Sequence, residues 1–548
     1  MKVNLIYGSI GPVFDTVKAQ VLYRRRSSME VYQTFLSDFH ASTGGWLLLL
    51  LGFLTALGIG GLIGVVPRVA TQRFAEIDFG LDEGLVCSSF ASHELPLACV
   101  KAASYAKGAA SYSALARHLM ALLMNSWAGS YSDIHGRKGK LPCTNWQVRL
   151  TPKNLSYLYM LCALNWMSAG RPIGVQIMCI LLVTLSPICF WLIQVCDRVH
   201  PIWYYVLESF AGVISIFSIA LTQLSDIMPP KHRAASYGLY FGSFMSGIAI
   251  APYLATLMSH VQITLFCSAV RILALFITIF FLPETLSVES RLAAASAAQA
   301  ERDNHRKQDS NATWSIISTL LQPFYKMSIL RRSSSLLLVA FGAFTSKMVF
   351  SADATLFFYY IESNLGAMDK DVAGMMFTAG VCGVFVQAGL FKYLITLLGE
   401  RRLLIVSFGC GCLHNLIYGL ARTKGFLYVA LCVSAFTHLD IALLSSVASR
   451  TVAPTEQGQV QGALFGLGAL AEAIGPISFN FVSKHSQAFG PGTMFVVGAI
   501  IYAFGMCAVA MVPSKRATET STEHDESENE SGSEDLDGRV GEREVLIL

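Results

Sequence analysis

Uninterrupted runs of apolar residues, each about 18 to 25 residues long, recur along most of this chain. A helix of that length crosses a hydrocarbon core about 30 Å thick, so each run predicts a membrane-spanning helix. The runs lie near 46–66, 109–129, 174–194, 201–224, 236–258, 262–282, 335–361, 371–393, 403–420, 425–447, 460–484 and 492–512. The pattern predicts an all-α membrane protein with about twelve transmembrane helices.

Composition excludes several other classes of protein. Of the 548 residues 53% are apolar and 14% charged, whereas an average soluble chain has roughly a quarter charged residues. A formal net charge of +4 gives no indication of a nucleic-acid partner. We find no glycine-rich phosphate loop, no catalytic constellation and no metal-ligand spacing, so we expect neither an ATP-driven pump nor an enzyme, and no cofactor or metal.

The second half of the chain repeats landmarks of the first. Pro230, Gly238, Gly242 and Ala251-Pro252 recur as Pro454, Gly462, Gly466 and Gly475-Pro476, each 224 positions later. This constant displacement indicates two pseudo-symmetric six-helix bundles with equivalent fifth and eleventh spans. Pro252, Gly475 and Pro476 are predicted to bend these helices as parts of a gate. Small residues at four-residue spacing, such as Gly238 and Gly242, predict close helix packing.

The loop after the second span carries an insertion. Gly136-Arg137-Lys138 corresponds to Gly399-Glu400-Arg401, and the displacement of 263 instead of 224 gives the first half about 39 extra residues. These fall near 141–173, whose apolar stretch is too short for a span and is expected at the interface or on the bundle.

These features divide the chain into segments. The expected order is a cytosolic tail 1–45, a bundle 46–282 with a long external loop 67–108 and the cytosolic insert 141–173, a central cytosolic loop 283–334, a second bundle 335–512, and a disordered acidic tail 513–548.

Basic residues predict the orientation. They cluster at Arg24-Arg25-Arg26, Arg137-Lys138, Lys231 to Arg233, 302–332 and Arg401-Arg402, all on one side of an even-numbered topology. Because basic loops stay inside, both termini are expected in the cytosol. The N-terminal residues do not resemble a cleavable signal peptide, so the first span is expected to be retained.

The last residues, Glu542 to Leu548, resemble an acidic dileucine sorting signal, which would bind adaptor proteins; the alternative is a frayed terminus. The choice between plasma membrane and endosomal or vacuolar membrane stays open.

Cys87 and Cys99 differ from the other cysteines because both lie in the long external loop. An oxidising compartment would allow a disulfide between them. The alternative is two unpaired loop thiols.

The segment after the second span, Gly129-Ser-Tyr-Ser-Asp133-Ile-His-Gly136-Arg137-Lys138, resembles the cytoplasmic loop signature of the major facilitator superfamily. Its glycines permit a tight turn, and its aspartate can face a helix N-terminus or a basic residue. The resemblance implies that Gly129, Asp133, Gly136 and Arg137 form a conformational latch. The alternative is a surface turn with solvated charges.

Ser449 to Gly462, followed by Gly475-Pro476, resembles the span-ten to span-eleven junction of the tetracycline-efflux-like and hippocampus-abundant-transcript-like group. Two features depart from that group. The antiporter pattern of span five is degraded at Ala251, Ala255 and Thr256, and Glu208 stands where such relatives often carry arginine. The motif therefore does not by itself predict proton antiport.

Charged residues inside spans cost about 2.5 to 3.5 kcal/mol each, so they are candidates for function. Asp440, with His438 nearby, is the first choice for ion coupling, because burial and a cation partner shift a carboxylate pKa in opposite directions. Glu472 and Glu208 are further candidates. Lys347, Asp353 and Arg271 are expected to line a central cavity. For Asp440 the alternative is a buried carboxylate bound by hydroxyls such as that of Ser445.

These features predict a secondary active transporter that moves a small organic solute by alternating access, with protons as the expected coupling ion. One alternative is a sensor or trafficking protein with the same fold that does not transport. A channel is disfavoured because it has no need of a two-state latch. Neither the solute nor the direction of transport follows from the fold.

Overall fold

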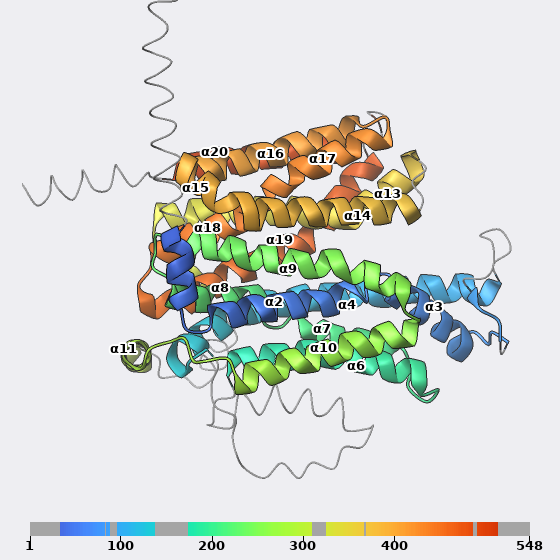
Figure 1. The fold of residues 1–548 in the computed structure, drawn as a ribbon, viewed down its shortest axis with the longest axis horizontal. Helices are drawn as coiled ribbons and strands as arrows, with labels where there is room; N and C mark the ends of the chain where they lie inside the picture. The colour runs from blue at the N-terminus through green and yellow to red at the C-terminus, as the bar shows by residue number, and fades with distance from the viewer. Residues whose placement is uncertain are drawn as a thin grey trace, which may run out of the picture.

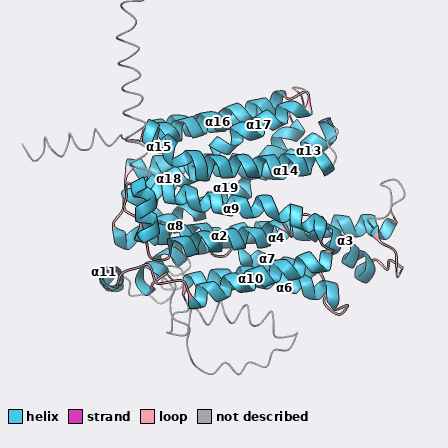
Figure 2. Ribbon diagram, viewed as in Figure 1, coloured by secondary structure: helices cyan, strands magenta, loops and turns pink. Residues whose placement is uncertain are grey.

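The computed structural model describes residues 33–82, 84–87, 96–137, 174–308, 325–365, 369–485, 490 and 492–512. The expected insert 141–173, the tail 513–548 and most of the tail 1–45 lie outside these residues. Within them every regular element is a helix, and the long helices run side by side along the longest axis of the molecule (Figure 1 and Figure 2).

The helices form two groups joined by α11 (Val288–Gln308). The first group comprises α2 (Gly45–Gly60), α3 (Val65–Asp78), α4 (Leu97–His135), α6 (Val175–Val195), α7 (Ile202–Ala211), α8 (Ile216–Ile227), α9 (Arg233–Leu257) and α10 (His260–Phe280). The second comprises α13 (Ser334–Leu365), α14 (Asp369–Val384), α15 (Phe391–Leu398), α16 (Glu400–Leu420), α17 (Lys424–Thr437), α18 (Leu439–Arg450), α19 (Gln457–His485) and α20 (Thr493–Ala510).

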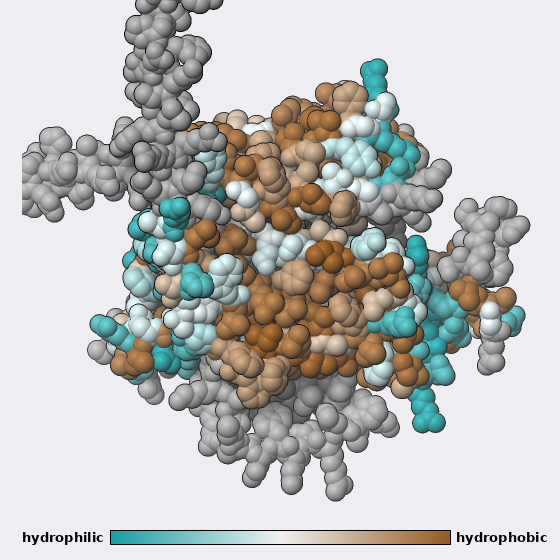
Figure 3. Space-filling view, in the orientation of Figure 1, coloured by the Kyte–Doolittle hydropathy of each residue, from teal (hydrophilic) through white to brown (hydrophobic). Residues whose placement is uncertain are grey.

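Ten helices or helix pairs are long and apolar enough to cross a membrane, and a bent pair, Gln33–Ala41 with Gly45–Gly60, makes an eleventh. The remaining predicted span lies in α4, whose 39 residues would extend about 58 Å. Serines and basic residues lower its hydropathy, although it is long enough to cross. The predicted all-α membrane fold is confirmed. Apolar residues cover the middle of the face seen in Figure 3, and hydrophilic residues gather at its two ends.

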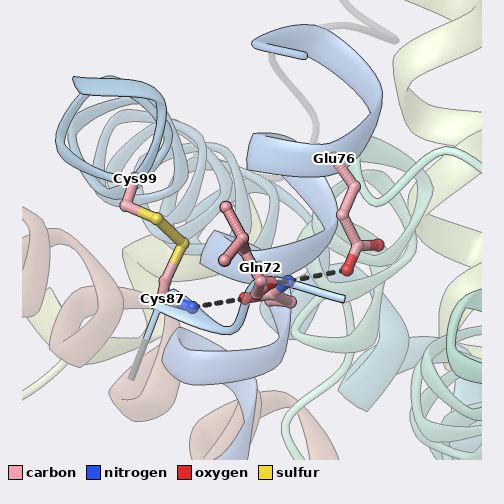
Figure 4. Close-up of a disulfide and its surroundings, with 5 residues drawn as sticks. Gln72, Glu76, Cys87 and Cys99 are labelled. Atoms are coloured by element: carbon pink, nitrogen blue, oxygen red, sulfur yellow. Dashed lines mark hydrogen bonds between the residues drawn. A yellow bond between two sulfur atoms is a disulfide. The ribbon is translucent and has the colours of Figure 1, made fainter. Parts of the chain in front are cut away.

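Two predicted loop regions contain helices. The segment 67–108 holds most of α3 and the first turns of α4, and the central segment holds α11. Both α3 and α11 have too many polar residues to register as apolar runs, so a search for spans overlooks them. Cys87, after α3, is bonded to Cys99 of α4, with Cα atoms 5.7 Å apart (Figure 4). The disulfide therefore ties α3 to the start of α4, and we call this end of the molecule the disulfide end.

The repeated glycines lie where the two bundles cross. Gly238 and Gly242 of α9 face Phe391 and Ala388 of the second bundle, and a Cβ atom at Gly242 would lie 2.9 Å from the Ala388 Cβ. Their counterparts Gly462 and Gly466 of α19 face Asn125 and Leu122 of α4. The predicted close packing therefore serves two equivalent contacts between the bundles.

Candidate functional site

Arg137 follows directly on the C-terminus of α4, at the opposite end of the bundles from the disulfide, which we call the latch end. Gly136 makes the turn with φ of 96°, a conformation that favours glycine. A Cβ atom there would also lie 2.7 Å from Glu284 Oε2. The sequence thus places a glycine where both the backbone and the available space require one.

The Arg137 side chain is fully buried between two carboxylates. Its Nη1 donates to Asp133 Oδ1 at 2.6 Å, and its Nε donates to Asp226 Oδ2 at 2.9 Å. Its backbone N–H donates to Glu284 Oε1 at 2.8 Å. Burial alone would lower the pKa of the guanidinium, but the charges of Asp226 and Asp133 outweigh it and raise that pKa. Arg137 is thus held charged in the interior of the latch end.

Asp133 joins the two bundles. Its carboxylate accepts hydrogen bonds from the backbone N–H groups of Gly458 (2.9 Å) and Gln459 (3.0 Å), in the first turn of α19. A helix N-terminus carries free N–H groups and partial positive charge, which suits a carboxylate. All the residues predicted as a latch lie in this region: Gly129, Asp133, Gly136 and Arg137. We call these four residues together with Asp226 the latch.

The second bundle has an ion pair at the equivalent positions, with the charges reversed. Arg137 corresponds by the repeat to Glu400, and Asp226 corresponds to Arg450. Glu400 and Arg450 form an ion pair. Arg450 also donates to the backbone oxygen of Pro230 in the first bundle, and Arg233 donates to the Ser449 hydroxyl at 2.7 Å in return. A second set of contacts therefore fastens the bundles at the same end.

The seam between α4 and α19 is tight from the latch to the middle of the molecule. At Gly129 a Cβ atom would lie 2.0 Å from the backbone oxygen of Gly458, and at Gly462 it would lie 2.2 Å from that of Asn125. The seam reaches His118, whose Nδ1 lies 3.4 Å from Glu472 Oε2.

Beyond Glu472, α19 packs against α13 of its own bundle. A Cβ atom at Gly475 would lie 2.2 Å from the backbone oxygen of Met348, and Pro476 lies inside the helix at this point. The side chain of Ile477, on the next residue, is 68% exposed. The predicted bend residues Gly475 and Pro476 thus lie in α19 just beyond Glu472, and Pro252 lies inside α9.

A cavity of about 710 Å³ lies beyond the end of the seam, on the disulfide side. The first turns of α4, with α7 and Phe79, form its walls. The lining residues are Phe79, Lys101, Tyr105, Gly108, Ala109, Tyr112, Ser113, Ala116, Ile202, Tyr205, Val206 and Ser209. Its wall is thus mainly aromatic and apolar, with hydroxyl groups and one lysine among the lining residues.

Glu472 binds a partner in each bundle. Lys347 of α13 donates to Glu472 Oε1 at 2.9 Å, while His118 of α4 faces the other carboxylate oxygen. Lys347 Nζ also lies 5.6 Å from the centre of the Phe350 ring. The predicted coupling candidate Glu472 and the predicted cavity residue Lys347 are therefore neighbours, at the point where the bundles meet.

Two other predicted residues lie in the first bundle. Glu208 of α7 forms an ion pair with Arg117 of α4 at 3.0 Å, near the inner end of the cavity. Arg271 of α10 is buried, and its Nη1 donates to the backbone oxygen of Val183 at 2.9 Å. Arg271 lies against Gly58 of α2 and is not among the residues that line the cavity.

Asp440 is 2% exposed and lies at the start of α18. Its carboxylate accepts from the Ser346 hydroxyl and from the backbone N–H of Ile441 at 2.6 Å. Ser346, instead of the expected Ser445, thus supplies the hydroxyl. A small cavity of about 20 Å³ beside Ser346 and Lys347 has room for about one water.

Asp353 of α13 faces Asn415 and His414 of α16, inside the second bundle. Its Oδ2 accepts from Asn415 Nδ2 at 3.0 Å and lies 3.5 Å from His414 Nε2. His414 was not a site candidate in the sequence, because nothing in its spacing links it to Asp353. The same holds for His118, whose partner Glu472 belongs to the other bundle. Among the residues that the structure describes, no three His, Cys, Asp or Glu side chains gather as metal ligands would.

Comparison with known proteins agrees with this architecture. The family model of the Major Facilitator Superfamily matches residues 155–476. Hippocampus abundant transcript-like protein 1 of Mus musculus is 22% identical over 354 residues, which cover 60% of this chain and 66% of the relative. The class H tetracycline resistance protein of Pasteurella multocida is 22% identical over 55% of this chain and 70% of its own length. The match thus spans just under two thirds of the first relative.

Two solved structures share the fold. The human organic anion transporter MFSD10 (TETRAN) has a TM-score of 0.62 at 17% identity and covers 85% of this chain and 98% of its own. The fucose–proton symporter FucP of E. coli has a TM-score of 0.54 at 12% identity, with coverage of 86% and 98%. The matched family model spans more than half of this chain, and the chain is an integral, multi-pass membrane protein that belongs to the Major Facilitator Superfamily.

Proposed function

We propose that this chain is a secondary active transporter that moves a small organic anion across the membrane by alternating access, coupled to protons. One observation carries the proposal: the seam between α4 and α19 is closed from the latch to Glu472 and gives way to a cavity beyond it. A pathway that is closed at one end and open at the other fits one state of a transport cycle.

The cavity suits an aromatic or amphipathic solute. Its volume of about 710 Å³ lies within the range of small-molecule sites, which are mostly apolar with a few placed polar groups. Tyr105, Tyr112, Tyr205 and Phe79 offer ring faces for packing. Such a wall favours an organic molecule over a bare inorganic ion.

The charges around the cavity favour an anion. Among the lining residues that the structure describes, Lys101 alone is charged. Ser113 lies one helical turn from Arg117, whose single charge is matched by Glu208. At the seam, Lys347 and His118 share the one carboxylate of Glu472. Arg117 and Lys347 are each matched by one carboxylate, so an anionic group in the cavity would meet the positive charge of Lys101.

The similar proteins support this substrate class in general terms. They include tetracycline resistance proteins, together with an organic anion transporter and a fucose–proton symporter, and the last two carry small solutes by their titles. We further propose that the latch end and both termini face the cytosol, because Lys231, Arg233, Arg401 and Arg402 lie at that end. The cavity would then open to the external or lumenal side.

Proton coupling is the second part of the proposal. Asp440 supports it because it is buried and, among the described residues, has no lysine or arginine within ion-pair distance. Glu472 supports it because it binds both bundles and would lose His118 when the seam opens. A solute anion that competes for Lys347 would free Glu472 to accept a proton.

Uptake into proteoliposomes tests this function. The purified full-length protein would be screened with radiolabelled aromatic carboxylates and sulfonates under an imposed pH gradient. We expect saturable uptake that rises with the gradient. Lys101→Glu should raise KM about tenfold or more, because reversal of one charge in the cavity costs at least about 1.4 kcal/mol of binding. Lys424→Glu, at a lysine outside the cavity, is the matched control.

Uptake that is equal for Lys101→Glu and the control would contradict the assigned cavity. A complete lack of uptake for every compound, from protein that still binds them, would favour a sensor that does not transport.

A further inference from the structure

The interior of the second bundle holds a titratable pair that takes no part in the seam or the cavity. Asp353 of α13 and His414 of α16 lie 3.5 Å apart, Oδ2 to Nε2. The Asn415 amide donates to both of them, at 3.0 Å to Asp353 Oδ2 and 2.9 Å to His414 Nε2. The side chains of Asp353 and His414 are only 13% and 6% exposed.

The hydrogen bonds of His414 identify the tautomer of its neutral ring. Its Nδ1 lies 3.1 Å from the backbone oxygen of Cys410, which can only accept. Nδ1 therefore carries the hydrogen of the neutral ring, and the Nε2 lone pair faces the amide of Asn415 and the carboxylate of Asp353. A proton placed between Asp353 and His414 has an acceptor on each side.

The pair has no other source of positive charge. Among the described residues, no lysine or arginine lies within ion-pair distance of Asp353, whereas Glu472 has Lys347 and Glu208 has Arg117. Asp353 Oδ1 and Asn415 Oδ1 are buried acceptors without a hydrogen-bond donor. Buried acceptors of this kind are costly and favour uptake of a positive ligand.

Counting protons gives the behaviour of the pair. With one proton it is neutral, either as the carboxylic acid beside neutral imidazole or as carboxylate beside imidazolium. Without that proton it leaves one negative charge in a low-dielectric interior, which costs several kcal/mol. The proton should therefore leave only when the site gains access to water.

We infer that Asp353 and His414 form a proton-binding site inside the second bundle, separate from the solute cavity, whose single proton is exchanged during the transport cycle. The inference rests on the proposed function and adds the pair to Asp440 and Glu472 as a place where the protein binds a proton. Asn415 is a positioning residue that holds the two groups face to face.

The pair connects to the seam through the break in span ten. The Thr437 hydroxyl, in the last turn of α17, lies 3.3 Å from His414 Nδ1. The helix is interrupted at His438 and resumes as α18, where Asp440 binds Ser346. Ser346 precedes Lys347, which holds Glu472 at the seam. Three hydrogen bonds, joined by short stretches of chain, therefore link the pair to the seam, and Asp440 lies on this route.

The titratable groups that face the pair are few. Apart from the two members themselves, they are Tyr418 of its own helix α16, Tyr502 of α20 and His438 at the break. None of them supplies a fixed positive charge near neutral pH.

Infrared difference spectroscopy of the purified protein tests the site without any solute. A pH step should reveal the C=O stretch of a carboxylic acid that forms as pH falls. Asp353→Asn should remove this band, and His414→Gln should shift the pH at which it forms. Asp371→Asn, at a partly exposed carboxylate paired with Lys424, is the matched control and should leave the band in place. A spectrum in Asp353→Asn identical to that of the control would overturn the inference.

Transport gives the second readout. Asp353→Asn should abolish accumulation driven by a pH gradient but keep solute counterflow, because exchange of solute for solute needs no net proton release. Loss of both modes in Asp353→Asn, with recovery of neither in Asp353→Glu, would point to a structural role and overturn the inference. Gradient-driven accumulation that survives Asp353→Asn would overturn it while leaving the proposed function intact. The absence of uptake by the unmodified protein would instead contradict the proposed function, and the infrared result would still decide the proton site.

Discussion

Arg137 shows how one side chain can hold a closed state. Its guanidinium bridges Asp133 and Asp226 in a fully buried position, and Asp133 in turn binds the start of α19. The ion pair within one bundle therefore positions the carboxylate that reaches the other. Loss of the arginine would therefore weaken both the ion pairs within the first bundle and the contact of Asp133 with α19.

Arg137→Gln should destabilise the protein by about 3 to 5 kcal/mol, because it leaves two buried carboxylates without a cation. Thermal melting of the detergent-solubilised protein would measure the effect as a lower Tm. Arg332→Gln is the matched control, because Arg332 is 57% exposed and its pair with Glu456 is worth at most about 1 kcal/mol. Equal shifts for the two variants would contradict the assigned role of Arg137.

At this scale the sequence predicts sites unevenly. The latch was accessible because its glycine, aspartate and arginine lie within nine residues and carry a local turn. The sequence does not predict the contact of Glu472 with His118 or that of Asp353 with His414, because each contact joins helices far apart in the chain. Apolar runs locate buried charges along their helices but do not give the rotation of each helix. Partners of buried charges therefore require the fold.

The seam between α4 and α19 is the central feature at the scale of elements. Its glycines allow the two helices to meet backbone to backbone from the latch to the middle of the molecule. The sequence repeat reveals two of these glycines, Gly462 and Gly466, because spacing survives duplication, whereas the polar helices α3 and α11 leave no apolar run to detect. The tightness of the seam makes it sensitive to single methyl groups.

Gly129→Ala should open the latch end, because the added methyl group would lie 2.0 Å from the backbone oxygen of Gly458. The reactivity of a cysteine at Ser126, which is fully buried, would report the opening through faster maleimide labelling of Ser126→Cys. Gly64→Ala is the control, since a Cβ atom there meets nothing within 4 Å. Unchanged labelling in Gly129→Ala would show that the seam tolerates the methyl group.

The disulfide should stabilise the extramembrane part of α3 and α4. Cys99→Ser is expected to cost roughly 3 kcal/mol, because the bond closes a loop with a separation of 12 residues. Thermal melting under non-reducing conditions would measure the loss, and a reducing agent should produce it in the unmodified protein. Cys196→Ser, at an exposed free cysteine of the same end, should leave Tm unchanged.

The whole molecule has two chemically different ends, separated by an apolar middle (Figure 3). One end carries the disulfide and the cavity, and the other carries the latch together with Lys231, Arg233, Arg401 and Arg402. Composition and run length predict the class of fold, and the positions of the basic residues predict that the two ends differ. They could not show which end is closed, because that depends on contacts between bundles.

An impermeant maleimide applied to intact cells should label a cysteine at Tyr112 in the cavity, whose side chain is 77% exposed. The variant Tyr112→Cys would be made together with Cys196→Ser to remove the exposed native thiol of that end. Arg332→Cys, at the latch end, should react only after the membrane is permeabilised. The opposite pattern would reverse the proposed orientation. For a protein that resides in an internal membrane, isolated vesicles would replace the cells.

The opposite polarity of the two ion pairs has a consequence for folding. In a chain with two similar halves, an element of one half can dock in the place reserved for its counterpart. Here such an exchange would set Arg137 against Arg450 and Asp226 against Glu400, so like charges would meet in a buried position. Only the native partners neutralise each other. The reversed charges thus distinguish the two halves, which their similar shape alone does not. They disfavour swapped assembly within one chain or between two copies.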